Sequence, residues 1–392
     1  MMKTLRNALI AMLFSSSLLA LDASFEILNE QASLPKLKIV DKSPQSPTKA
    51  RFYNAVKNDL EVSASFELVE ENPDYIFEYN YDHFTVSARI SSQINELHSF
   101  NANINAIPGA EVFLAHTLIA ELGRRMGLED LSWMTQKVIF AKQTGKKHSQ
   151  IVVADYTLAW EQVLLKGGLN LFPKWANKEQ TAFYYTDLLT PLPSVMKYDV
   201  KSGAKSKILS SQGMAIVSDV NANGTELLIT MAPKDQADVY KYNLLTKQLS
   251  QISNYPGIDV AGQFVDDGRV AFVSDRLGYP NLFIKDARGV SQLVYHGKNN
   301  SAMSVNGDYI VYSSRDASGG SFNLYLMSLR SDFVRALTAS GKNIFPIFSQ
   351  NGNTIMFIKL LGGQSSLGIL RINQNKVFFF PQRGGKIQAM DW

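Results

Sequence analysis

The sequence of 392 residues contains no cysteine. Disulfide bonds, cysteine-ligated zinc sites and thiol catalysis are therefore excluded. An excess of charge of either sign is also lacking, because 39 Lys and Arg residues stand against 35 Asp and Glu residues. So small a net charge gives no electrostatic argument for nucleic-acid binding. After the first twenty residues there is no long apolar run, so we expect the mature chain to be soluble.

Motifs typical of enzymes are scarce as well. The five histidines lack a metal-type spacing such as His-Glu-x-x-His, and there is no Gly-x-Ser-x-Gly elbow and no Gly-rich phosphate loop before a helix. Ser202 and Lys205 match Ser-x-x-Lys, but they fall in a predicted hairpin turn. His116 lies among apolar residues of a predicted helix, and we interpret it as a packed or half-exposed side chain. The sequence therefore assigns no catalytic residue, metal ligand or cofactor site.

The first twenty residues have the three parts of a secretory signal peptide. Lys3 and Arg6 form a positive n-region, Leu9–Leu19 is an apolar core, and Ala20 is a small residue suited to cleavage. The core is too short for a membrane-spanning helix, which needs about 20 apolar residues. We predict export and cleavage near Ala20. Loss of Lys3 and Arg6 leaves 37 basic and 35 acidic residues, a net charge of +2.

Residues 21–130 mix helix and strand patterns. Apolar residues spaced by three and four predict a helix that Thr48 begins and a second helix that Pro108-Gly109 opens. Alternating apolar residues predict short strands between these helices, two of which form a hairpin near Asn80–Asp82. We therefore predict a small α/β domain over residues 21–130.

After residue 131 the helical patterns stop and a repeat of 39–45 residues begins. Each unit starts with a large side chain, has a turn four residues later, and continues into two apolar strands. The large side chains are Trp175, Val220, Phe264, Met303 and Phe348. The turns are Asn-Gly or Asp-Gly, except that Lys178-Glu179 replaces the first, and they predict two central residues with positive φ. This period, with about four strands a unit, is typical of a β-propeller blade.

The remaining segments supply one more blade. Five units span residues 168–382, residues 137–166 contain three strands, and the chain ends with Ile387–Trp392, which matches the first strand of a unit with Trp392 in the aromatic position. We predict that this last strand pairs with the first three and closes a six-bladed propeller over residues 131–392. Closure removes the exposed sheet edges. An irregular β-sandwich is the alternative, but a sandwich has no reason to repeat its turn at a constant period.

A signal peptide, a small α/β domain and a six-bladed propeller that ends in an aromatic strand together resemble the TolB family of the Tol–Pal envelope system. Phe264–Gly268 followed by Phe272–Arg276 is similar to the family's Trp-Ser-Pro-Asp-Gly and Ser-Asp/Ser-Arg blade motifs. Phe52–Leu60 and Ser63–Val69 resemble the family's early helix and strand. The chain departs from the pattern in keeping Trp at only two of the aromatic positions. The resemblance covers nearly the whole chain.

The resemblance implies a periplasmic, monomeric protein-binding scaffold rather than an enzyme. TolB-like proteins bridge the inner-membrane protein TolA and the peptidoglycan-associated lipoprotein Pal, and so reach the outer membrane and support its integrity and envelope constriction in division. By resemblance, TolA would bind the start of the mature chain: Leu21, Asp22, Ala23, Ser24, Phe25, Glu26 and Ile27. Pal would bind the segments that enter the innermost strands: Gly213, Met214, Ala215, Ile258, Asp259, Val260, Lys298, Asn299, Asn300, Lys342, Asn343 and Ile344. A frayed terminus and solvated loops are the alternatives for these two sets.

Two other functions stay open from the residues alone. A periplasmic enzyme or small-ligand binder would use the propeller channel and would need carboxylates on innermost strands, for which Asp219 and Asp266 are candidates without an evident partner. Asp275 and Arg276 are interpreted as an ion pair at a hairpin end. A purely structural propeller of an outer-membrane assembly complex is the third hypothesis, and the TolB-like first domain argues against it.

Overall fold

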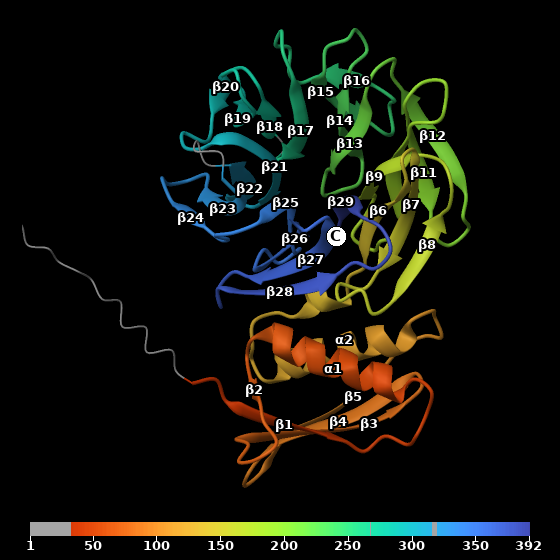
Figure 1. Ribbon diagram of the computed structural model, residues 1–392, viewed down its shortest axis with the longest axis vertical. Helices are drawn as coiled ribbons and strands as arrows, with labels where there is room; N and C mark the ends of the chain where they lie inside the picture. Colours follow the sequence, from red (N-terminus) through yellow and green to blue (C-terminus); the bar gives the residue numbers. More distant parts are fainter. Residues whose placement is uncertain (1–32, 267, 316–319) are drawn as a thin grey trace, which may run out of the picture. The chain divides into compact units, whose positions relative to one another are not determined.

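The computed structural model describes residues 33–266, 268–315 and 320–392. Among them, Pro35–Trp392 forms one compact unit, in which a five-stranded sheet with two helices precedes a series of antiparallel strands (Figure 1). The predicted signal peptide and the predicted TolA-binding segment Leu21–Ile27 lie outside the described residues. No helix in the described part of the chain is long and apolar enough to cross a bilayer.

The first sheet has the strand order β2-β1-β3-β4-β5. Its strands are β1 (Lys36–Asp41), β2 (Glu67–Leu68), β3 (Tyr75–Asp82), β4 (Thr85–Ser92) and β5 (Glu96–Asn103). β1 pairs in parallel with β2 and β3, whereas β3, β4 and β5 form an antiparallel meander. The sequence does not predict β5, because only Phe100 and Ala102 of this strand are buried and the alternation is correspondingly weak.

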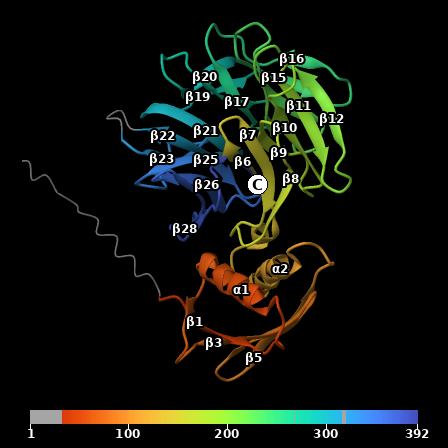
Figure 2. The ribbon, with the colours of Figure 1, turned by 45° about the vertical axis from the view of Figure 1, so that its right-hand side comes forward.

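The helices α1 (Lys49–Ser63) and α2 (Ala110–Arg125) cover one face of this sheet (Figure 2). The buried residues of α1 recur every three or four positions, as predicted, whereas α2 buries all of Ala110–His116. Both helices form one core with the sheet. Thr48 occupies the predicted N-cap position of α1, but its hydroxyl bonds to Tyr81 Oη at 2.8 Å instead of capping the helix backbone. The side chain therefore fixes the helix to the sheet.

The rest of the chain forms six blades of four antiparallel strands (Figure 1). The 3₁₀ helix η1 (Ser132–Thr135) leads into them. Blade 1 combines the C-terminal β29 (Ile387–Asp391) with β6 (Val138–Gly145), β7 (His148–Ala154) and β8 (Glu161–Leu165). Blades 2 and 3 are β9 (Asn170–Trp175), β10 (Ala182–Asp187), β11 (Ser194–Asp199), β12 (Lys205–Ser210), and β13 (Ala215–Val220), β14 (Glu226–Met231), β15 (Asp238–Asn243), β16 (Leu249–Gln251).

The other three blades continue the pattern. They are β17 (Asp259–Phe264), β18 (Val270–Ser274), β19 (Asn281–Asp286), β20 (Gly289–Gln292); β21 (Lys298–Asn306), β22 (Tyr309–Arg315), β23 (Phe322–Ser328), β24 (Val334–Ala336); and β25 (Lys342–Phe348), β26 (Thr354–Leu361), β27 (Gln364–Arg371), β28 (Lys376–Pro381). Blades 5 and 6 are linked by a single parallel pair, Phe322 and Lys342, and each keeps its own antiparallel ladder.

The predicted closure of the ring is confirmed. β29 pairs with β6, with Met390 opposite Phe140 and Asp391 opposite Ile139. Trp392 follows β29 and packs edge-on against Trp133, with ring centroids 5.6 Å apart. Both tryptophans belong to the core that also contains α1 and α2. The closing strand therefore ends inside the contact between the propeller and the first sheet's helices.

The hairpin turns differ from the prediction in one respect. The turns at Gly224 and Gly352 close with a bond from the glycine N–H to the carbonyl of Asn221 or Ser349, and only the glycine takes a positive φ. These are type I turns with glycine in the fourth position, not turns with two central residues of positive φ. In blade 2, Gln180 adopts the same left-handed conformation, with φ 55°, and closes the turn on Asn177.

The strand register also corrects the predicted repeat in blade 5. Phe264 pairs with Val270 and Phe348 with Ile355, at the ends of their hairpins. In blade 5 the corresponding pair is Val305 and Ile310, whereas Met303 lies two residues further from the turn. The turn of this blade is shorter than those of blades 4 and 6. The repeat, aligned on the turn glycine, therefore assigned Met303 to the position that Val305 occupies in the structure.

Candidate binding site at the propeller channel

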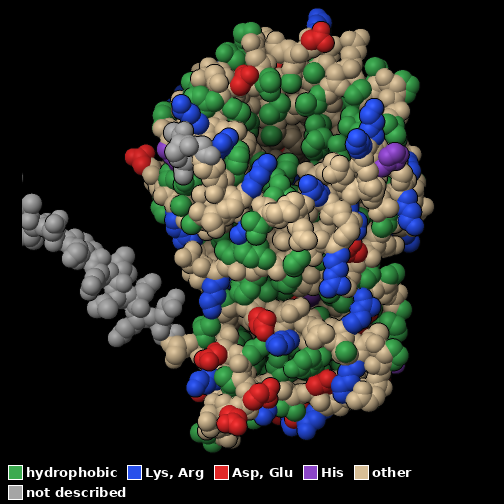
Figure 3. All heavy atoms as spheres, viewed as in Figure 1, with side chains coloured by type: hydrophobic (Ala, Val, Ile, Leu, Met, Phe, Trp, Pro, Cys, Tyr) green, Lys and Arg blue, Asp and Glu red, His purple; other side chains and the backbone are tan. Residues whose placement is uncertain are grey.

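The innermost strands of the six blades enclose a channel with a cavity of about 440 Å³. Its walls are mainly apolar and come from every blade; they include Phe172, Ile216, Val260, Met303, Phe345 and Met390. Figure 3 shows a hollow over the propeller that is bordered by hydrophobic side chains. A volume of this size lies within the range of small-molecule and side-chain pockets, about 300–1,000 Å³.

Every innermost strand is bulged where it passes the cavity. The register of each first hairpin shifts in the middle of the strand. In four blades the bulge contains a non-glycine residue of positive φ: Phe172, Ala261, Ala302 and Phe345. A bulge bends a strand and redirects its side chains, and these residues line the cavity. The ring thus holds six adjacent strands in irregular backbone at one level of the channel, and sequence periodicity gave no sign of it.

A polar ring below these bulges connects neighbouring blades. Asp391 Oδ2 accepts the backbone N–H of Trp175 at 2.8 Å, and Asp219 Oδ2 accepts that of Phe264 at 2.8 Å. Ser304 Oγ accepts the N–H of Phe348 at 3.2 Å. In each case the accepting residue directly precedes the large residue of its own blade, which is Trp392, Val220 or Val305. Alternate junctions of the ring are therefore closed in the same way.

Lys174 lies between the two carboxylates of this polar ring. Its ammonium is 2.9 Å from Asp391 and 3.8 Å from Asp219. Burial lowers the pKa of Lys174, but the two carboxylates outweigh this and raise it. Burial raises the pKa of Asp219, against the opposing effect of Lys174. Asp219 thus does have a partner, which the sequence did not reveal, and the pair fastens the closing strand to blades 2 and 3.

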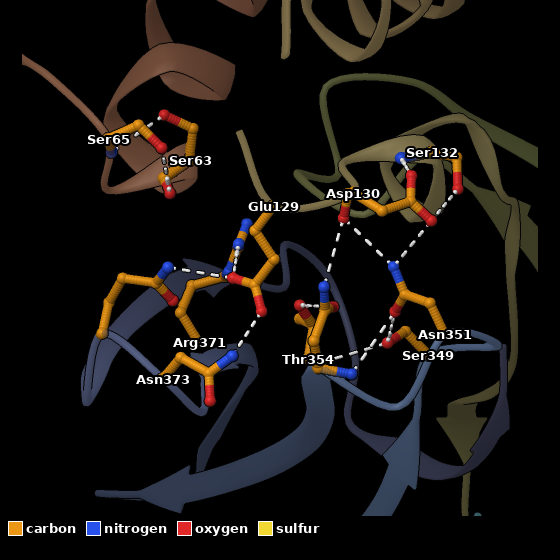
Figure 4. A network of polar contacts seen from close by, with 12 residues as sticks. Ser63, Ser65, Glu129, Asp130, Ser132, Ser349, Asn351, Thr354, Arg371 and Asn373 are labelled. Atoms are coloured by element: carbon orange, nitrogen blue, oxygen red, sulfur yellow. Dashed lines mark hydrogen bonds and ion pairs between the residues drawn. The ribbon is translucent and has the colours of Figure 1, made fainter. Parts of the chain in front are cut away.

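The segment before η1 is attached to blade 6 by a polar cluster (Figure 4). Glu129 accepts bonds from Arg371, Asn373 and Gln374, at 2.5–2.9 Å. Asp130 accepts bonds from Asn351 at 3.0 Å and 3.1 Å. The Arg371 side chain is fully buried and its guanidinium lies over the Trp133 ring, 5.5 Å from the centroid. Burial tends to raise the pKa values of both carboxylates, but the hydrogen bonds that they accept together outweigh it and lower them.

A second cluster joins both helices to blade 1 and is completely buried. His116 of α2 contacts Asp59 of α1 through Nδ1 at 2.7 Å and Asp155 of the β7–β8 turn through Nε2 at 3.5 Å. Tyr156 donates its hydroxyl to Asp59 at 2.5 Å. Asp155 also accepts bonds from the hydroxyl and N–H of Thr157. Burial lowers the pKa of His116, but the two carboxylates raise it to about 10, so the imidazole is a buried cation.

The amino-acid sequence matches a known family. The family model of the TolB beta propeller domain matches residues 130–392. The Tol-Pal system protein TolB of Campylobacter jejuni is 48% identical over 397 residues, which cover 98% of each chain. The chain belongs to the TolB family. The Tol-Pal system proteins TolB of Wolinella succinogenes and Helicobacter hepaticus are 40% and 36% identical to this TolB-family chain, with 96% and 98% of it covered, and 97% and 99% of their own lengths.

A solved structure gives the same fold for the family. The crystal structure of TolB from Acinetobacter baumannii superposes with a TM-score of 0.78, over 91% of this chain and 96% of that one, at 19% identity. This likeness concerns the fold alone. The predicted fold class, a six-bladed propeller after a small α/β domain, is confirmed. The domain boundaries at residues 20 and 130 stay predictions.

In this TolB-family chain the predicted Pal-binding residues fall into two groups. Gly213, Met214, Ile258, Lys298 and Lys342 are exposed, and Val260, Asn299 and Ile344 are half-buried. The other four residues are buried: Ala215 and Asp259 begin β13 and β17, whereas Asn300 and Asn343 follow the exposed first residues of β21 and β25.

The polar members of the buried group brace the loops of the TolB propeller. Asn300 donates to Asn281 and to the His296 carbonyl. Asn343 donates to the carbonyls of Phe322 and Ser340. These side chains are engaged inside the protein, so the exposed group provides the side chains that a partner can contact.

The structure also places the other charged residues that the sequence singled out. Arg276 pairs with Asp259 at 3.1 Å, not with Asp275, which accepts the N–H of Ile258 instead. Asp266 lies in the exposed hairpin turn of blade 4, where it binds Arg269 at 2.6 Å, and is not among the cavity residues. His116 is an ion-paired buried residue, which a single apolar helix pattern could not distinguish from a packed one. No group of three His, Asp or Glu in the described residues is arranged to hold a metal ion.

Proposed function

We propose that this chain is a periplasmic scaffold that binds Pal at the channel face of the propeller and TolA through Leu21–Ile27. In that role it links the inner membrane to the peptidoglycan and outer membrane, supports envelope integrity and division, and catalyses no reaction. Its membership of the TolB family, whose relatives are named Tol-Pal system proteins, supports this assignment.

The observation that carries the proposal is the difference between the channel face and the opposite side of the ring. The helices α1 and α2 pack against the β7–β8 turn and blade 6, where Asp155 and Arg371 are buried. The loops at the other end of the channel keep large apolar side chains in solvent, such as Ile258 and Leu361. Exposed apolar residues around a hollow are typical of protein-binding surfaces.

The first experiment is a calorimetric titration of the mature chain with Pal from the same organism. We expect one-to-one binding, retained when Leu21–Ile27 is deleted. A matching titration with the periplasmic domain of TolA should show binding to the intact chain and none to the deleted one. Absence of Pal binding by both forms would refute the assignment of Pal as a partner. Equal TolA binding by both forms would refute the assignment of Leu21–Ile27 as the TolA-binding segment.

A small-ligand function is the second candidate, because the cavity of about 440 Å³ has the size of a ligand pocket. Among the cavity residues, Lys174, Asp391 and Gln263 supply charged and polar groups. A thermal-shift screen of envelope sugars and lipids would test it. A ligand that raises the Tm, found for a chain that binds no Pal, would favour this function over the scaffold.

A further inference from the structure

One face of the propeller is defined by the direction of its innermost strands. The first residues of these strands pair with the last residues of the second strands, as Lys298 with Arg315 and Ala215 with Met231. The loops that enter the first strand and the loops between the second and third strands therefore lie at the same end of the channel. We call this set of loops the channel-mouth face.

The channel-mouth face has an excess of exposed positive charge. Six of its segments each present an exposed basic side chain that makes no ion pair among the described residues: Lys147, Lys166, Lys234, Lys298, Lys342 and Arg383. Among the described residues of these segments, Asp235 is the one acidic residue that is exposed. Asp187 and Asp275 are half-buried and accept the N–H groups of Leu189 and Ile258.

The loops at the opposite end of the channel combine charges of both signs. Arg269 pairs with Asp266 at 2.6 Å, Arg288 with Asp286 at 2.9 Å, and Arg330 with Asp308 at 2.8 Å. The first two pairs are each formed within one hairpin, and the third joins the two hairpin turns of blade 5. Exposed Lys201 and Lys247 also lie at that end, but exposed Glu179 and Asp332 lie there as well. The excess of positive charge is therefore a property of the channel-mouth face and not of the propeller loops in general.

Apolar side chains are interspersed with these basic groups. Tyr295 is 81% exposed, Leu361 69% and Ile258 53%, and each lies in or beside a segment of the channel-mouth face. Figure 3 shows the hollow with hydrophobic side chains at its border and Lys and Arg side chains around it. A central apolar pocket with a polar periphery is the usual arrangement of a protein-binding surface.

We propose that the channel-mouth face recognises its protein partner by charge, so that the partner presents an acidic surface around an apolar protrusion that enters the channel. This inference rests on the proposed function and specifies the chemistry of the Pal surface that binds there. Exposed lysines held apart by the blades repel one another, and an acidic partner relieves this repulsion. A folded protein fits better than a lipid surface, because a planar bilayer places no group in the recessed cavity of about 440 Å³.

The test compares a charge-reversed variant with a matched control. The variant carries Lys298→Glu, Lys342→Glu and Arg383→Glu on the channel-mouth face. The control carries Lys201→Glu, Lys205→Glu and Lys247→Glu, which are exposed lysines at the opposite end of blades 2 and 3. Both have the same net charge. Equal melting temperatures would show that both fold, since all six side chains are solvent-exposed.

Binding of Pal from the same organism is measured by calorimetry at 50 mM and 500 mM NaCl. We expect the affinity of the unchanged chain and of the control to fall at least about tenfold with the added salt. The channel-mouth variant should bind at least about tenfold more weakly at 50 mM NaCl and lose most of the salt dependence, because like charges then face each other.

Three results would overturn the proposal. Pal binding that is equal in the variant and the control refutes the charge recognition and leaves the scaffold function intact. No Pal binding by the unchanged chain refutes the scaffold function and this inference with it. Binding of the unchanged chain, but not of the variant, to vesicles with 30% phosphatidylglycerol, together with unaltered Pal binding, assigns the basic side chains to a membrane surface instead.

Discussion

The two ends of the propeller channel use charged side chains in opposite ways. On the side that meets α1 and α2, His116, Asp155 and Arg371 are fully buried and each has an ionic partner. On the channel-mouth face, lysines such as Lys298 and Lys342 stay in solvent. A buried ion needs a partner in fixed geometry, whereas an exposed one retains its hydration and can exchange it for another molecule. The first end is thus built for a permanent contact and the second for a reversible one.

The largest effect should follow from removing one partner of the buried cluster. Asp59→Ala leaves protonated His116 with Asp155 at 3.5 Å and removes the acceptor of Tyr156. We expect the free energy of unfolding to fall by about 3–5 kcal/mol, because His116 loses the shorter of its two ionic contacts and the buried Tyr156 hydroxyl loses its acceptor. Urea unfolding followed by tryptophan fluorescence measures it.

The control for this variant is Asp82→Ala. Asp82 is 73% exposed at its side chain, and its ion-pair partner is His83 at 3.8 Å. The control should lower the free energy of unfolding by less than about 1 kcal/mol. Similar losses in both variants would mean that the buried cluster contributes no more than a surface pair.

The same cluster predicts a pH dependence of stability. The groups that face His116 are Asp59 from α1, and Asp155 and Tyr156 from the turn after β7. The pKa of His116 is about 10 in the folded chain and about 6.5 when unfolded. Its contribution is therefore complete below pH 6.5 and is lost as the pH rises toward 10.

This dependence is measured by urea unfolding at several pH values between 6 and 10. The free energy of unfolding should decline across this interval in the unchanged chain, and the decline should be much smaller in His116→Gln. Burial raises the pKa of Asp59, against the opposing effect of His116. A decline of the same size in His116→Gln would assign the alkaline loss to other groups.

A smaller effect is expected where the ring closes. Asp391→Ala removes the acceptor of the Trp175 N–H and one partner of Lys174, while Asp219 remains near the ammonium. We expect a loss of about 1.5–3 kcal/mol, the usual contribution of a hydrogen bond to a charged group. Asp332→Ala, on an exposed hairpin, is the control and should change little. If Asp391→Ala also changed little, the closure would depend on the β29–β6 ladder alone.

The repeat made the propeller predictable, because each blade buries its second strand in the same way. Ile229, Phe272 and Ile355, for example, all lie in apolar runs that follow a turn. Details that depend on neighbouring blades were not predictable. The bulges at Phe172 and Phe345 arise where six strands converge, and no local pattern records that crowding. The same holds for Lys174, whose two partners are 45 and 217 residues away in sequence.

The candidate site was predictable only in outline. The position of the channel-mouth face followed from the repeat, since the segments that enter the innermost strands recur at a fixed place in each unit. Which of its residues are exposed did not, because Asn300 and Asn343 are as polar as any loop residue and are nevertheless buried by hydrogen bonds to neighbouring loops. Polarity alone does not distinguish a buried residue that hydrogen-bonds to neighbouring loops from an exposed residue that a partner can contact.

The smallest effect on stability should accompany the clearest effect on binding. Ile258→Ser and Tyr295→Ser replace exposed side chains, so each should change the free energy of unfolding by no more than about 0.5 kcal/mol. Both should weaken Pal binding, because apolar groups near the centre of an interface contribute most of its energy. The matched control is Leu245→Ser, because Leu245 is likewise exposed, at 78%, but lies at the opposite end of blade 3. Calorimetric affinities that fall equally in all three variants would remove the distinction between the two ends of the channel, since the exposed apolar residues would then act alike wherever they lie.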